Sequence, residues 1–314
     1  MSRAIHVVAA AIVDRDGRVL LTERPQGKHL AGYWEFPGGK IELNETSIEG
    51  LEREIFEEIG LHIDHCRPLI DVEHAYAEKT VRLEVWRVDR FHGDPHGKEG
   101  QRWAWVDVAQ LGSWKLPPAD VPIVNALQLP STYCITPEPG DMTTFLAALE
   151  RTLERGERLL QLRAKQLDPS RFATLAREFV ARCHAVGARA LLNCDPVLAQ
   201  ALGADGAHLS SALLTTFSDR PIAAPFWLGA SCHDARELAL AEKLGLDFAV
   251  LGPVAPTSSH PGRQPIGWSG FRELVRRVNI PVYALGGMSR TDVARAWDHG
   301  GQGVAGIRDF WMDR

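Results

Sequence analysis

The sequence lacks the features that mark several classes of protein. Basic residues do not dominate, because 35 lysines and arginines stand against 40 acidic residues and the formal net charge is −5 at pH 7. A protein that coats nucleic acid needs a dominating basic surface, so we expect no binding to duplex nucleic acid. No apolar run approaches the roughly 20 residues that a membrane-spanning helix needs, so we expect no membrane insertion.

Cysteine is scarce as well. The chain has five cysteines, an odd number, and no C-x-x-C pair, which indicates neither a zinc site nor a disulfide framework. The first residues lead directly into a strand-like run, without the apolar core or cleavage site of a signal peptide. We therefore expect an enzyme of the reducing cytoplasm.

The hydrophobic pattern changes near residue 130, and 314 residues are about right for two compact domains. In residues 1–130, strands and helices mix irregularly. Strands are expected at 6–13, 19–22, 81–85 and 103–106, and helices at 46–59 and 120–129. This mixture predicts an α+β fold or a layered α/β/α arrangement.

Residues 131–314 instead alternate short apolar strands with helical segments of roughly 10–15 residues. The eight expected strands are 133–135, 159–162, 190–192, 206–209, 227–230, 248–251, 282–285 and 303–305. No hairpin signals separate them, so we expect parallel pairing. Eight such units close into a (β/α)₈ TIM barrel.

Three glutamates in the helix expected at 46–59 share one face. Glu54, Glu57 and Glu58 stand at positions i, i+3 and i+4, which are neighbours on an α-helix. Like charges placed in this way repel unless a cation holds them. Clustered carboxylate oxygens suit Mg²⁺, which leaves its remaining positions to water and substrate phosphates. The spacing therefore predicts a magnesium site.

The alternative is a solvated acidic face, the usual explanation of a glutamate-rich helix. It explains neither the Gly38-Gly39 pair before the helix nor the Gly60 stop after it. It also gives no role to Arg53, which we expect to pair with Glu45. The apolar residues expected to seat the helix against a sheet are Ile48, Leu51, Ile55 and Ile59.

The segment matches the pattern G-x5-E-x7-R-E-U-x-E-E-x-G-U, with U aliphatic, at every specified position. The matching residues are Gly39, Glu45, Arg53, Glu54, Ile55, Glu57, Glu58, Gly60 and Leu61. This is the Nudix box, and residues 4–129 resemble the Nudix hydrolases, which split nucleoside diphosphates linked to another group. Segments 35–42, 97–101 and 116–120 are similar to the MutT branch, the 8-oxo-dGTP diphosphatases. The resemblance implies a Nudix α/β/α sandwich with a mixed sheet over residues 1–130.

The resemblance also implies a catalytic metal centre that uses Mg²⁺, with Mn²⁺ as a substitute. Glu58 and the Gly38 carbonyl would hold the metal. Glu54 and Glu57 would complete the cluster, and Glu99 would approach from the loop before the last strand. In the implied reaction water attacks the β-phosphorus and the nucleoside monophosphate leaves, with Glu54 as our candidate for the general base.

The residues that the resemblance implies for nucleotide binding are Arg24, His29, Glu35, Phe36, Pro37, Gly38, Lys79 and Asp120. Arg24 matches a phosphate-contacting arginine, and Phe36 lies where the branch stacks the purine. Asp120 stands where the branch reads the oxidised base with asparagine, which both donates and accepts hydrogen bonds. An ionised aspartate only accepts, so the O6 acceptor finds a partner only if Asp120 is protonated. The alternative is that Asp120 caps the helix beginning at Val121.

Segments of residues 131–314 resemble the thiamin phosphate synthase and TenI (thiazole tautomerase) family: 133–136, 161–165, 203–209, 252–257 and 284–288. Most of them lie at or just after the end of an expected strand, where barrel active sites are built. The resemblance implies a site for a thiamin-type phosphate. Its candidate residues are Gln161, Arg163, Lys165, Asn193, His233, Thr257, Gly286 and Gly287.

This barrel departs from the synthase pattern where the family binds Mg²⁺ and pyrophosphate. Cys194 and Leu213 stand in place of the two metal-binding aspartates. His260 replaces a lysine, and Arg308 replaces a serine of the phosphate corner. The leaving pyrophosphate would lose its main electrostatic stabilisation, so we expect no normal thiamin phosphate synthase activity. His233 coincides with the proton-transferring histidine of the tautomerase branch, and the alternative is a capping or packing role.

Three functional hypotheses remain. The first is a Mg²⁺-dependent diphosphatase that clears 8-oxo-dGTP, beside a vestigial or auxiliary barrel. The second turns the same hydrolase chemistry on a thiamin-pathway pyrophosphate, with the barrel as a thiazole tautomerase or ligand sensor. The third makes the barrel a non-catalytic ligand sensor or an oligomerisation scaffold. Agreement with the MutT branch outside the Nudix box favours the first, and the sequence does not define the oligomeric state.

Overall fold

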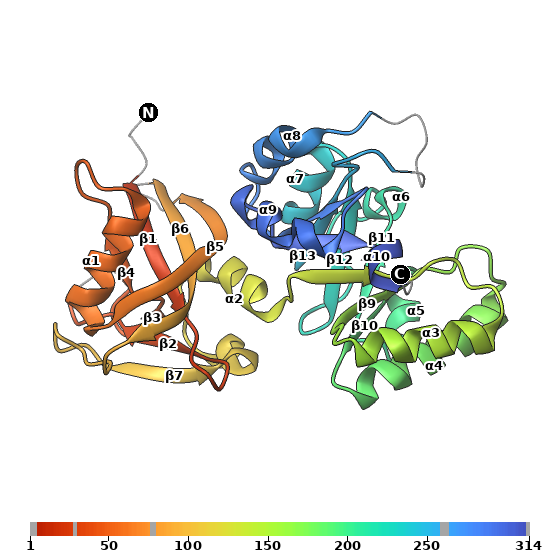
Figure 1. Cartoon of the computed structure of the whole chain (residues 1–314), viewed down its shortest axis with the longest axis horizontal. Coiled ribbons are helices and arrows are strands. Elements are labelled where there is room, and N and C mark those ends of the chain that lie inside the picture. Colours follow the sequence, from red (N-terminus) through yellow and green to blue (C-terminus); the bar gives the residue numbers. More distant parts are fainter. Residues whose placement is uncertain (1–4, 28–29, 76–79, 258–263, 312–314) are drawn as a thin grey trace. The chain divides into compact units, whose positions relative to one another are not determined.

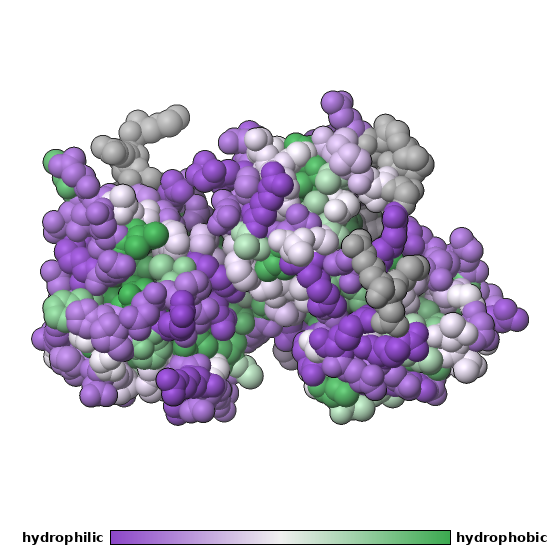
Figure 2. Space-filling model, in the orientation of Figure 1, coloured by the Kyte–Doolittle hydropathy of each residue, from purple (hydrophilic) through white to green (hydrophobic). Residues whose placement is uncertain are grey.

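The chain forms two compact units, Met1–Gln128 and Leu129–Arg314. The computed structural model describes residues 5–27, 30–75, 80–257 and 264–311. Hydrophilic side chains cover most of the visible surface of each unit (Figure 2). Within the described ranges, no helix has the length and apolar character needed to cross a membrane.

The first unit combines two β-sheets with helices. Its strands are β1 (Ile5–Ile12), β2 (Arg18–Glu23), β3 (Trp34–Glu35), β4 (Gly38–Lys40), β5 (His62–Ala75), β6 (Thr80–His92) and β7 (Trp103–Asp107). Its helices are α1 (Ser47–Ile59) and α2 (Val121–Gln128), with 3-10 turns at Val108–Ser113 and Pro118–Asp120. One sheet has the order β4-β1-β6-β5 and the other β3-β2-β7 (Figure 1). The first sheet is mixed, because β1 pairs parallel with β6 and antiparallel with β4.

Strand β1 is buried on both faces, and this arrangement creates the layers of the unit. One hydrophobic cluster joins β1 to α1 through Val8, Ala10, Ile12, Leu51, Ile55 and Ile59. The other joins the opposite face of β1 to α2 through Ala9, Ala11, Ile123, Val124 and Leu127. The predicted α/β/α sandwich with a mixed sheet is confirmed. The expectation that Ile48 helps to seat α1 is wrong, because this first-turn side chain is 42% exposed.

Capping residues define both ends of helix α1. The Thr46 side chain accepts from the Glu49 N–H while the Glu49 side chain accepts from the Thr46 N–H, which is a capping box. Gly60 ends the helix in the left-handed conformation, with φ 75°. Both signals are local in the sequence, and the predicted helix is confirmed.

No pattern in the sequence predicted β5, the longest described strand. Its pairing with β6 contains register shifts at Ile63/His65, His65/Cys66 and Pro68/Ile70, so its side chains do not alternate regularly between the two faces. Pro68 also lies within it, which a strand at the edge of a sheet tolerates. Hydrogen-bonded pairing with β6 forms this strand, although its sequence lacks a regular alternation of apolar and polar residues.

The second unit is a closed barrel of eight parallel strands surrounded by helices, and the predicted (β/α)₈ fold is confirmed. The strands are β8 (Thr132–Ile135), β9 (Leu159–Leu162), β10 (Arg189–Leu192), β11 (Gly206–Leu209), β12 (Trp227–Cys232), β13 (Phe248–Leu251), β14 (Val282–Leu285) and β15 (Gly303–Gly306). The helices are α3 (Met142–Glu154), α4 (Pro169–Ala185), α5 (Pro196–Ala201), α6 (Ser211–Leu214), α7 (Ala235–Lys243), α8 (Gly267–Val275), α9 (Val293–Asp298) and α10 (Arg308–Trp311), with a 3-10 turn at Arg290–Asp292.

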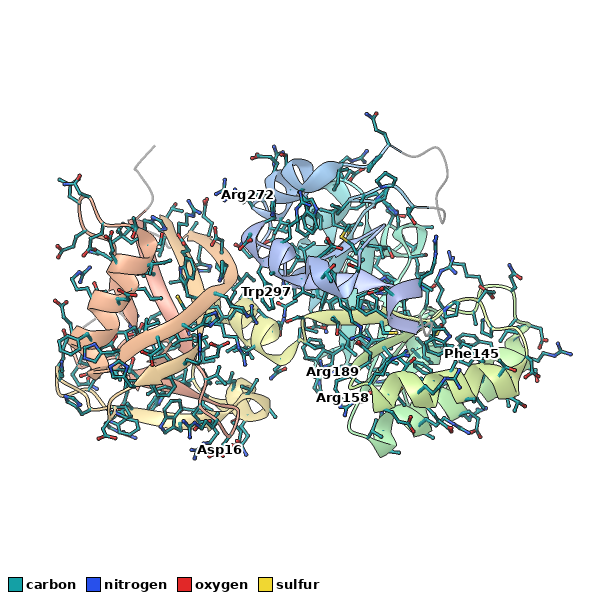
Figure 3. The ribbon with its side chains drawn as sticks, in the orientation of Figure 1. Asp16, Phe145, Arg158, Arg189, Arg272 and Trp297 are labelled. Atoms are coloured by element: carbon teal, nitrogen blue, oxygen red, sulfur yellow. The ribbon has the colours of Figure 1, made fainter. Side chains whose placement is uncertain are left out.

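The barrel has an inner and an outer core. The inner one fills the space between the strands and contains Tyr133, Leu159, Leu191, Phe248 and Tyr283. The outer one lies between strands and helices. Within it, Phe145 of α3 (Figure 3) packs against Trp311 of α10 with ring centroids 4.9 Å apart, which ties the last helix to the first helix of the barrel.

Candidate active sites

In the first unit, Glu58 is fixed between α1 and β4. Its Oε2 accepts a hydrogen bond of 2.9 Å from the backbone N–H of Gly38. Gly38 has φ 155°, and a Cβ at this position would lie 2.1 Å from the carbonyl oxygen of Val8. Only glycine therefore allows β4 to pair with β1 and to present its N–H to the carboxylate.

Glu58 lies in surroundings that disfavour its charge. Burial, together with the charges of Glu35 and Glu99, raises the pKa of Glu58 to about 7, although the Gly38 N–H opposes the rise. Glu99 belongs to the loop before β7, and Gln101 ties that loop to α1. The Nε2 of Gln101 donates to the Glu58 carbonyl (2.9 Å), and its Oε1 accepts from the Glu99 N–H (3.0 Å). A cation at this position would stabilise the ionised carboxylates.

Arg53 organises the remaining carboxylates of the helix. Its predicted pairing with Glu45 is confirmed, with Nε 2.7 Å from Oε1 and Nη2 2.9 Å from Oε2. Hydrogen bonding to Arg53 lowers the pKa of Glu45 to about 2. The same guanidinium donates to Glu54 at 2.9 Å and to Glu57 at 3.2 Å. Glu54 also lies against β4, where a Cβ on Gly39 would approach its carboxyl to 2.2 Å.

The three helix glutamates do not converge on one point as the spacing predicted. Within the described residues, no three Asp, Glu, His or Cys side chains are arranged to hold one metal ion. Arg53 attracts Glu54 and Glu57, whereas the Gly38 N–H holds Glu58, because each carboxylate turns to the nearest positive partner. The metal-ligating atoms that α1 and β4 offer are nonetheless all oxygens, and hard divalent cations prefer oxygen ligands. Glu58, Glu54 and the Gly38 carbonyl would hold such an ion.

The residues predicted to bind the nucleotide differ in burial and in their contacts. Arg24 forms an ion pair with Glu35 of β3. Phe36 is only 5% exposed and belongs to the hydrophobic core, so little of its surface is accessible to a stacked base. Pro37 is buried, and its carbonyl accepts from the Ala10 N–H at 2.8 Å. His29 and Lys79 lie outside the described residues.

Asp120, the residue predicted to read the base, is buried. It is 5% exposed, and its Oδ2 has no hydrogen-bond partner within the described ranges. Burial and the charge of Glu35 raise the pKa of Asp120 to about 8, against the opposing charge of Arg24. The helix-capping alternative would place backbone N–H groups of α2 on this carboxyl, and an orphan Oδ2 does not fit that role.

The candidate residues of the second unit belong to one end of the barrel. Gln161 lies one residue before the C-terminal end of β9, and the other described members follow the C-terminal ends of their strands, as expected for a barrel site. Gln161 is 3% exposed and its Oε1 lacks a partner within the described chain. The N–H of Arg163 donates to Thr136 (2.9 Å), and the Nδ2 of Asn193 donates to the His208 carbonyl (2.7 Å). The other candidates are Lys165, which is exposed, Thr257, Gly286 and Gly287, whereas His260 lies outside the described residues.

His233 is oriented by an acidic residue of the next helix. Its Nδ1 lies 2.9 Å from Oε2 of Glu237, which also accepts the His233 N–H at 2.7 Å. Ser211 donates to the other oxygen of Glu237. The capping alternative for His233 is wrong, because Asp234 caps α7 with its own carboxylate. Among the residues that the structure describes, Nε2 of His233 has no hydrogen-bond partner, whereas Nδ1 is held by Glu237.

Sequence reasoning missed three polar residues inside the barrel. The hydroxyl of Tyr133 lies 3.1 Å from Nδ1 of His208, and Nε2 of His208 lies 2.9 Å from Oγ of Ser231. Strand alternation alone could have placed these side chains in the interior. Their contact with one another depends on the closure of the barrel, which brings β8, β11 and β12 together.

Comparison with known proteins agrees with this geometry. A family model described as NUDIX domain matches residues 8–126, and one described as thiamine monophosphate synthase matches residues 132–310. The chain belongs to both families. It is a Nudix pyrophosphohydrolase domain fused to a thiamine monophosphate synthase/TenI-like barrel. Nudix hydrolases generally use divalent metal ions, and both domains imply small phosphate-bearing substrates.

Three relatives illustrate the two halves. The 8-oxo-dGTP diphosphatase of Escherichia coli (strain K12) is 32% identical over 126 residues, which cover 40% of this chain and 98% of that protein. The CTP pyrophosphohydrolase of the same organism is 35% identical over 119 residues, 38% of this chain and 88% of that protein. A protein named putative thiamine-phosphate synthase 2, of Aquifex aeolicus (strain VF5), is 38% identical over 184 residues, 59% of this chain and 99% of that protein.

Proposed function

We propose that the Nudix domain is a Mg²⁺-dependent diphosphatase that hydrolyses 8-oxo-dGTP and related oxidised purine nucleotides to the monophosphate and pyrophosphate. In the cytoplasm this would prevent mutagenic incorporation during DNA synthesis. The observation that carries the proposal is Glu58 of α1, a half-buried carboxylate that accepts from the Gly38 N–H of β4 and lies near the charges of Glu35 and Glu99. The similarity to the 8-oxo-dGTP diphosphatase of Escherichia coli supports the substrate.

The residues of the domain supply most of the chemistry in this proposal. Glu54 lies against Gly39 and takes a proton from the attacking water. The water oxygen forms a bond to the β-phosphorus, the bond from that phosphorus to the α,β-bridging oxygen breaks, and the nucleoside monophosphate leaves. Glu58, Glu54 and the Gly38 carbonyl would hold a Mg²⁺ ion, which would supply positive charge to stabilise the leaving oxygen. Arg53 keeps Glu54 in place through its hydrogen bond.

Asp120 supports selection of the oxidised base. A neutral carboxylic acid has one O–H donor and one free oxygen acceptor, the same pair that an asparagine side chain offers. The acceptor would bind the N7–H that 8-oxoguanine gains, and the donor would bind O6. The raised pKa of Asp120, about 8, favours this neutral form at pH 7.

For the barrel we propose binding of a thiamin-type phosphate at the C-terminal mouth. A specific observation favours an acid–base role there, because Glu237 orients His233 through Nδ1. Thiazole tautomerisation is a reaction that such a histidine can support without a metal. The chain would then combine a nucleotide hydrolase in the first domain with a thiazole tautomerase in the barrel.

The test is steady-state hydrolysis by the full chain with Mg²⁺. The panel contains 8-oxo-dGTP, 8-oxo-GTP, dGTP, CTP and thiamin diphosphate, and pyrophosphate is measured separately from phosphate. We expect the highest kcat/KM for the 8-oxo nucleotides, with pyrophosphate released. In Glu58→Gln and Glu54→Gln, kcat should fall by about 10²–10⁴-fold.

The matched control is Glu52→Gln, an exposed glutamate of the same helix, which should keep full activity. A preference for CTP or thiamin diphosphate would reassign the substrate. Near-normal turnover in both Glu54→Gln and Glu58→Gln would refute the carboxylate–metal mechanism itself.

A further inference from the structure

Thr22 of β2 carries a buried hydroxyl group close to the carboxyl group of Glu58. Thr22 is 1% exposed, and its Oγ1 has no hydrogen-bond partner of regular geometry in the described part of the chain. Burial raises the pKa of Glu58, and the Gly38 N–H and the Thr22 side chain oppose that rise. The hydroxyl therefore lies near enough to act on the Glu58 carboxyl without forming a regular hydrogen bond to it.

The geometry of β2 explains why this side chain faces the site. Leu20 stands two residues before Thr22, on the same side of the strand, and belongs to the same buried cluster as Ile55 of α1. Thr22 also stands directly opposite Glu35 of β3, so these two side chains share one face of the sheet. Position 22 therefore lies where the apolar contact between β2 and α1 ends and the carboxylates begin.

Threonine is an unfavourable residue for this position unless its hydroxyl has a role. A buried hydroxyl without a partner costs free energy, whereas valine has a similar shape and no polar group. Both residues are β-branched and suit a strand, so neither packing nor strand formation favours threonine over valine. Glu35, the residue opposite, forms an ion pair with Arg24. The carboxylate of Glu58 is therefore the acceptor for which the Thr22 hydroxyl is suited.

We propose that Thr22 is a positioning residue of the Nudix reaction, whose hydroxyl donates to the Glu58 carboxylate and fixes the orientation in which Glu58 binds the divalent cation. The Gly38 N–H of β4 already donates to Oε2 of Glu58 at 2.9 Å. A second donor on β2 would restrain rotation of the carboxyl group, because two hydrogen bonds from different strands define its plane. Hydrogen bonds that orient a metal ligand raise the affinity for the metal. This inference rests on the metal role of Glu58 in the proposed function.

The first test measures binding of Mn²⁺ to the full chain without nucleotide, by electron paramagnetic resonance of the free ion. The binding that is lost in Glu58→Gln defines the site. Thr22→Val should weaken this binding by about 10–100-fold, and Thr22→Ser, which keeps the hydroxyl, should restore most of it. The matched control is Thr152→Val, because Thr152 is a buried threonine of the barrel whose hydroxyl donates to the Ala148 carbonyl at 2.9 Å. It should bind Mn²⁺ like the wild type.

Two outcomes of this test separate the two proposals. If Glu58→Gln loses the ion and Thr22→Val binds it like the wild type, Thr22 is not a positioning residue and the proposed function stands. If Glu58→Gln itself binds Mn²⁺ like the wild type, the metal role of Glu58 fails, and the role of Thr22 fails with it.

The second test compares the dependence of 8-oxo-dGTP hydrolysis on Mg²⁺ and on the nucleotide. In Thr22→Val the Mg²⁺ concentration for half-maximal activity should rise about tenfold, while KM for 8-oxo-dGTP at saturating Mg²⁺ should stay within about twofold of the wild type. A raised KM with an unchanged Mg²⁺ dependence would show that the hydroxyl contacts the nucleotide and would overturn the proposal. So would a loss of Mn²⁺ affinity that Thr22→Ser does not restore and that accompanies a lower unfolding temperature in EDTA, because this pattern indicates a structural role.

Discussion

At the scale of single residues, the carboxyl groups of Glu58 and Asp120 in the Nudix domain lie in different environments. Glu58 is half-buried, the Gly38 N–H donates to its carboxylate, and the charges of Glu35 and Glu99 lie nearby. Asp120 is buried with an orphan oxygen. Burial raises the pKa of both groups, and only Glu58 has a hydrogen-bond donor that opposes the rise. In the proposed function, Glu58 binds the cation as a carboxylate and Asp120 reads the base as a neutral acid.

The protonation of Asp120 gives a prediction about pH. Its folded pKa of about 8 means that the donor is present below pH 8 and is lost as the pH rises through that value. The kcat/KM for 8-oxo-dGTP should therefore decline between about pH 7 and pH 9 in the wild type, because the lost donor is the one that binds O6. In Asp120→Asn, which keeps a donor and an acceptor at all these pH values, this decline should be absent.

The measurement is kcat/KM for 8-oxo-dGTP from pH 6 to pH 9.5, expressed at each pH as the ratio of wild type to Asp120→Asn, so that the titration of other groups cancels. Asp120→Leu, which removes both hydrogen-bonding groups, serves as the control and should have a low kcat/KM whose ratio to that of Asp120→Asn does not change with pH. A ratio of wild type to Asp120→Asn that stays constant to pH 9.5 would show that Asp120 does not read the base as a neutral acid.

At the scale of secondary structure, the catalytic region depends on the contact of α1 with β4. The capping box at Thr46 and the Gly60 stop fix the ends of α1, and buried leucine and isoleucine side chains fix its face against β1. Strand β4 is short, and its two glycines permit close approach from both sides. Val8 lies close on one side of it and Glu54 on the other.

Gly38→Ala should therefore damage stability and activity together. The added Cβ would lie 2.1 Å from the Val8 carbonyl oxygen at a φ of 155°, so β4 must shift and carry its N–H away from Glu58. We expect the free energy of unfolding to fall by about 1–3 kcal/mol and kcat/KM for 8-oxo-dGTP to fall at least tenfold.

Denaturant titration and steady-state kinetics measure the two effects. Gly112→Ala is the matched control, because a Cβ there meets no atom within 4 Å, and it should change neither quantity appreciably. Wild-type activity in Gly38→Ala would show that the position of β4 does not matter to the reaction.

At the scale of the whole molecule, each compact unit has its own core and its own candidate site. The barrel fold is complete, with eight paired strands, so the residues at its mouth rather than its architecture decide its chemistry. Cys194 and Leu213 supply no carboxylate at the two positions where the synthase pattern has metal-binding aspartates.

The full chain should therefore fail to form thiamin phosphate from the precursors of the synthase reaction in the presence of Mg²⁺. Product formation is measured by chromatography, with authentic thiamin phosphate added to a parallel sample to establish the detection limit. If the wild-type chain interconverts the thiazole isomers and His233→Ala does not, the activity of the barrel is thiazole tautomerisation. Synthase turnover on the order of 1 s⁻¹ would contradict the expectation.

Much of the fold and part of the sites could be predicted from local signals. The ends of α1, the eight barrel strands and the pairing of Arg53 with Glu45 all follow from residues close in sequence or from regular periodicity. Strand β5 could not be predicted, because its register shifts remove the alternation. Nor could the orientations of Glu54 and Glu57, since helix geometry gives the face of a side chain and not the partner toward which it turns.

The sequence by itself determined the two families, the order of the elements and the positions of the candidate residues, because glycines, caps and hydrophobic periodicity act over short distances. Only the tertiary structure decided which side chains are buried and what they meet. Burial raises the pKa of Asp120 and lowers the pKa of His208, and the side chains that bury each of them come from distant parts of the chain. Desolvation depends on the whole surrounding core, and no local stretch of sequence specifies it.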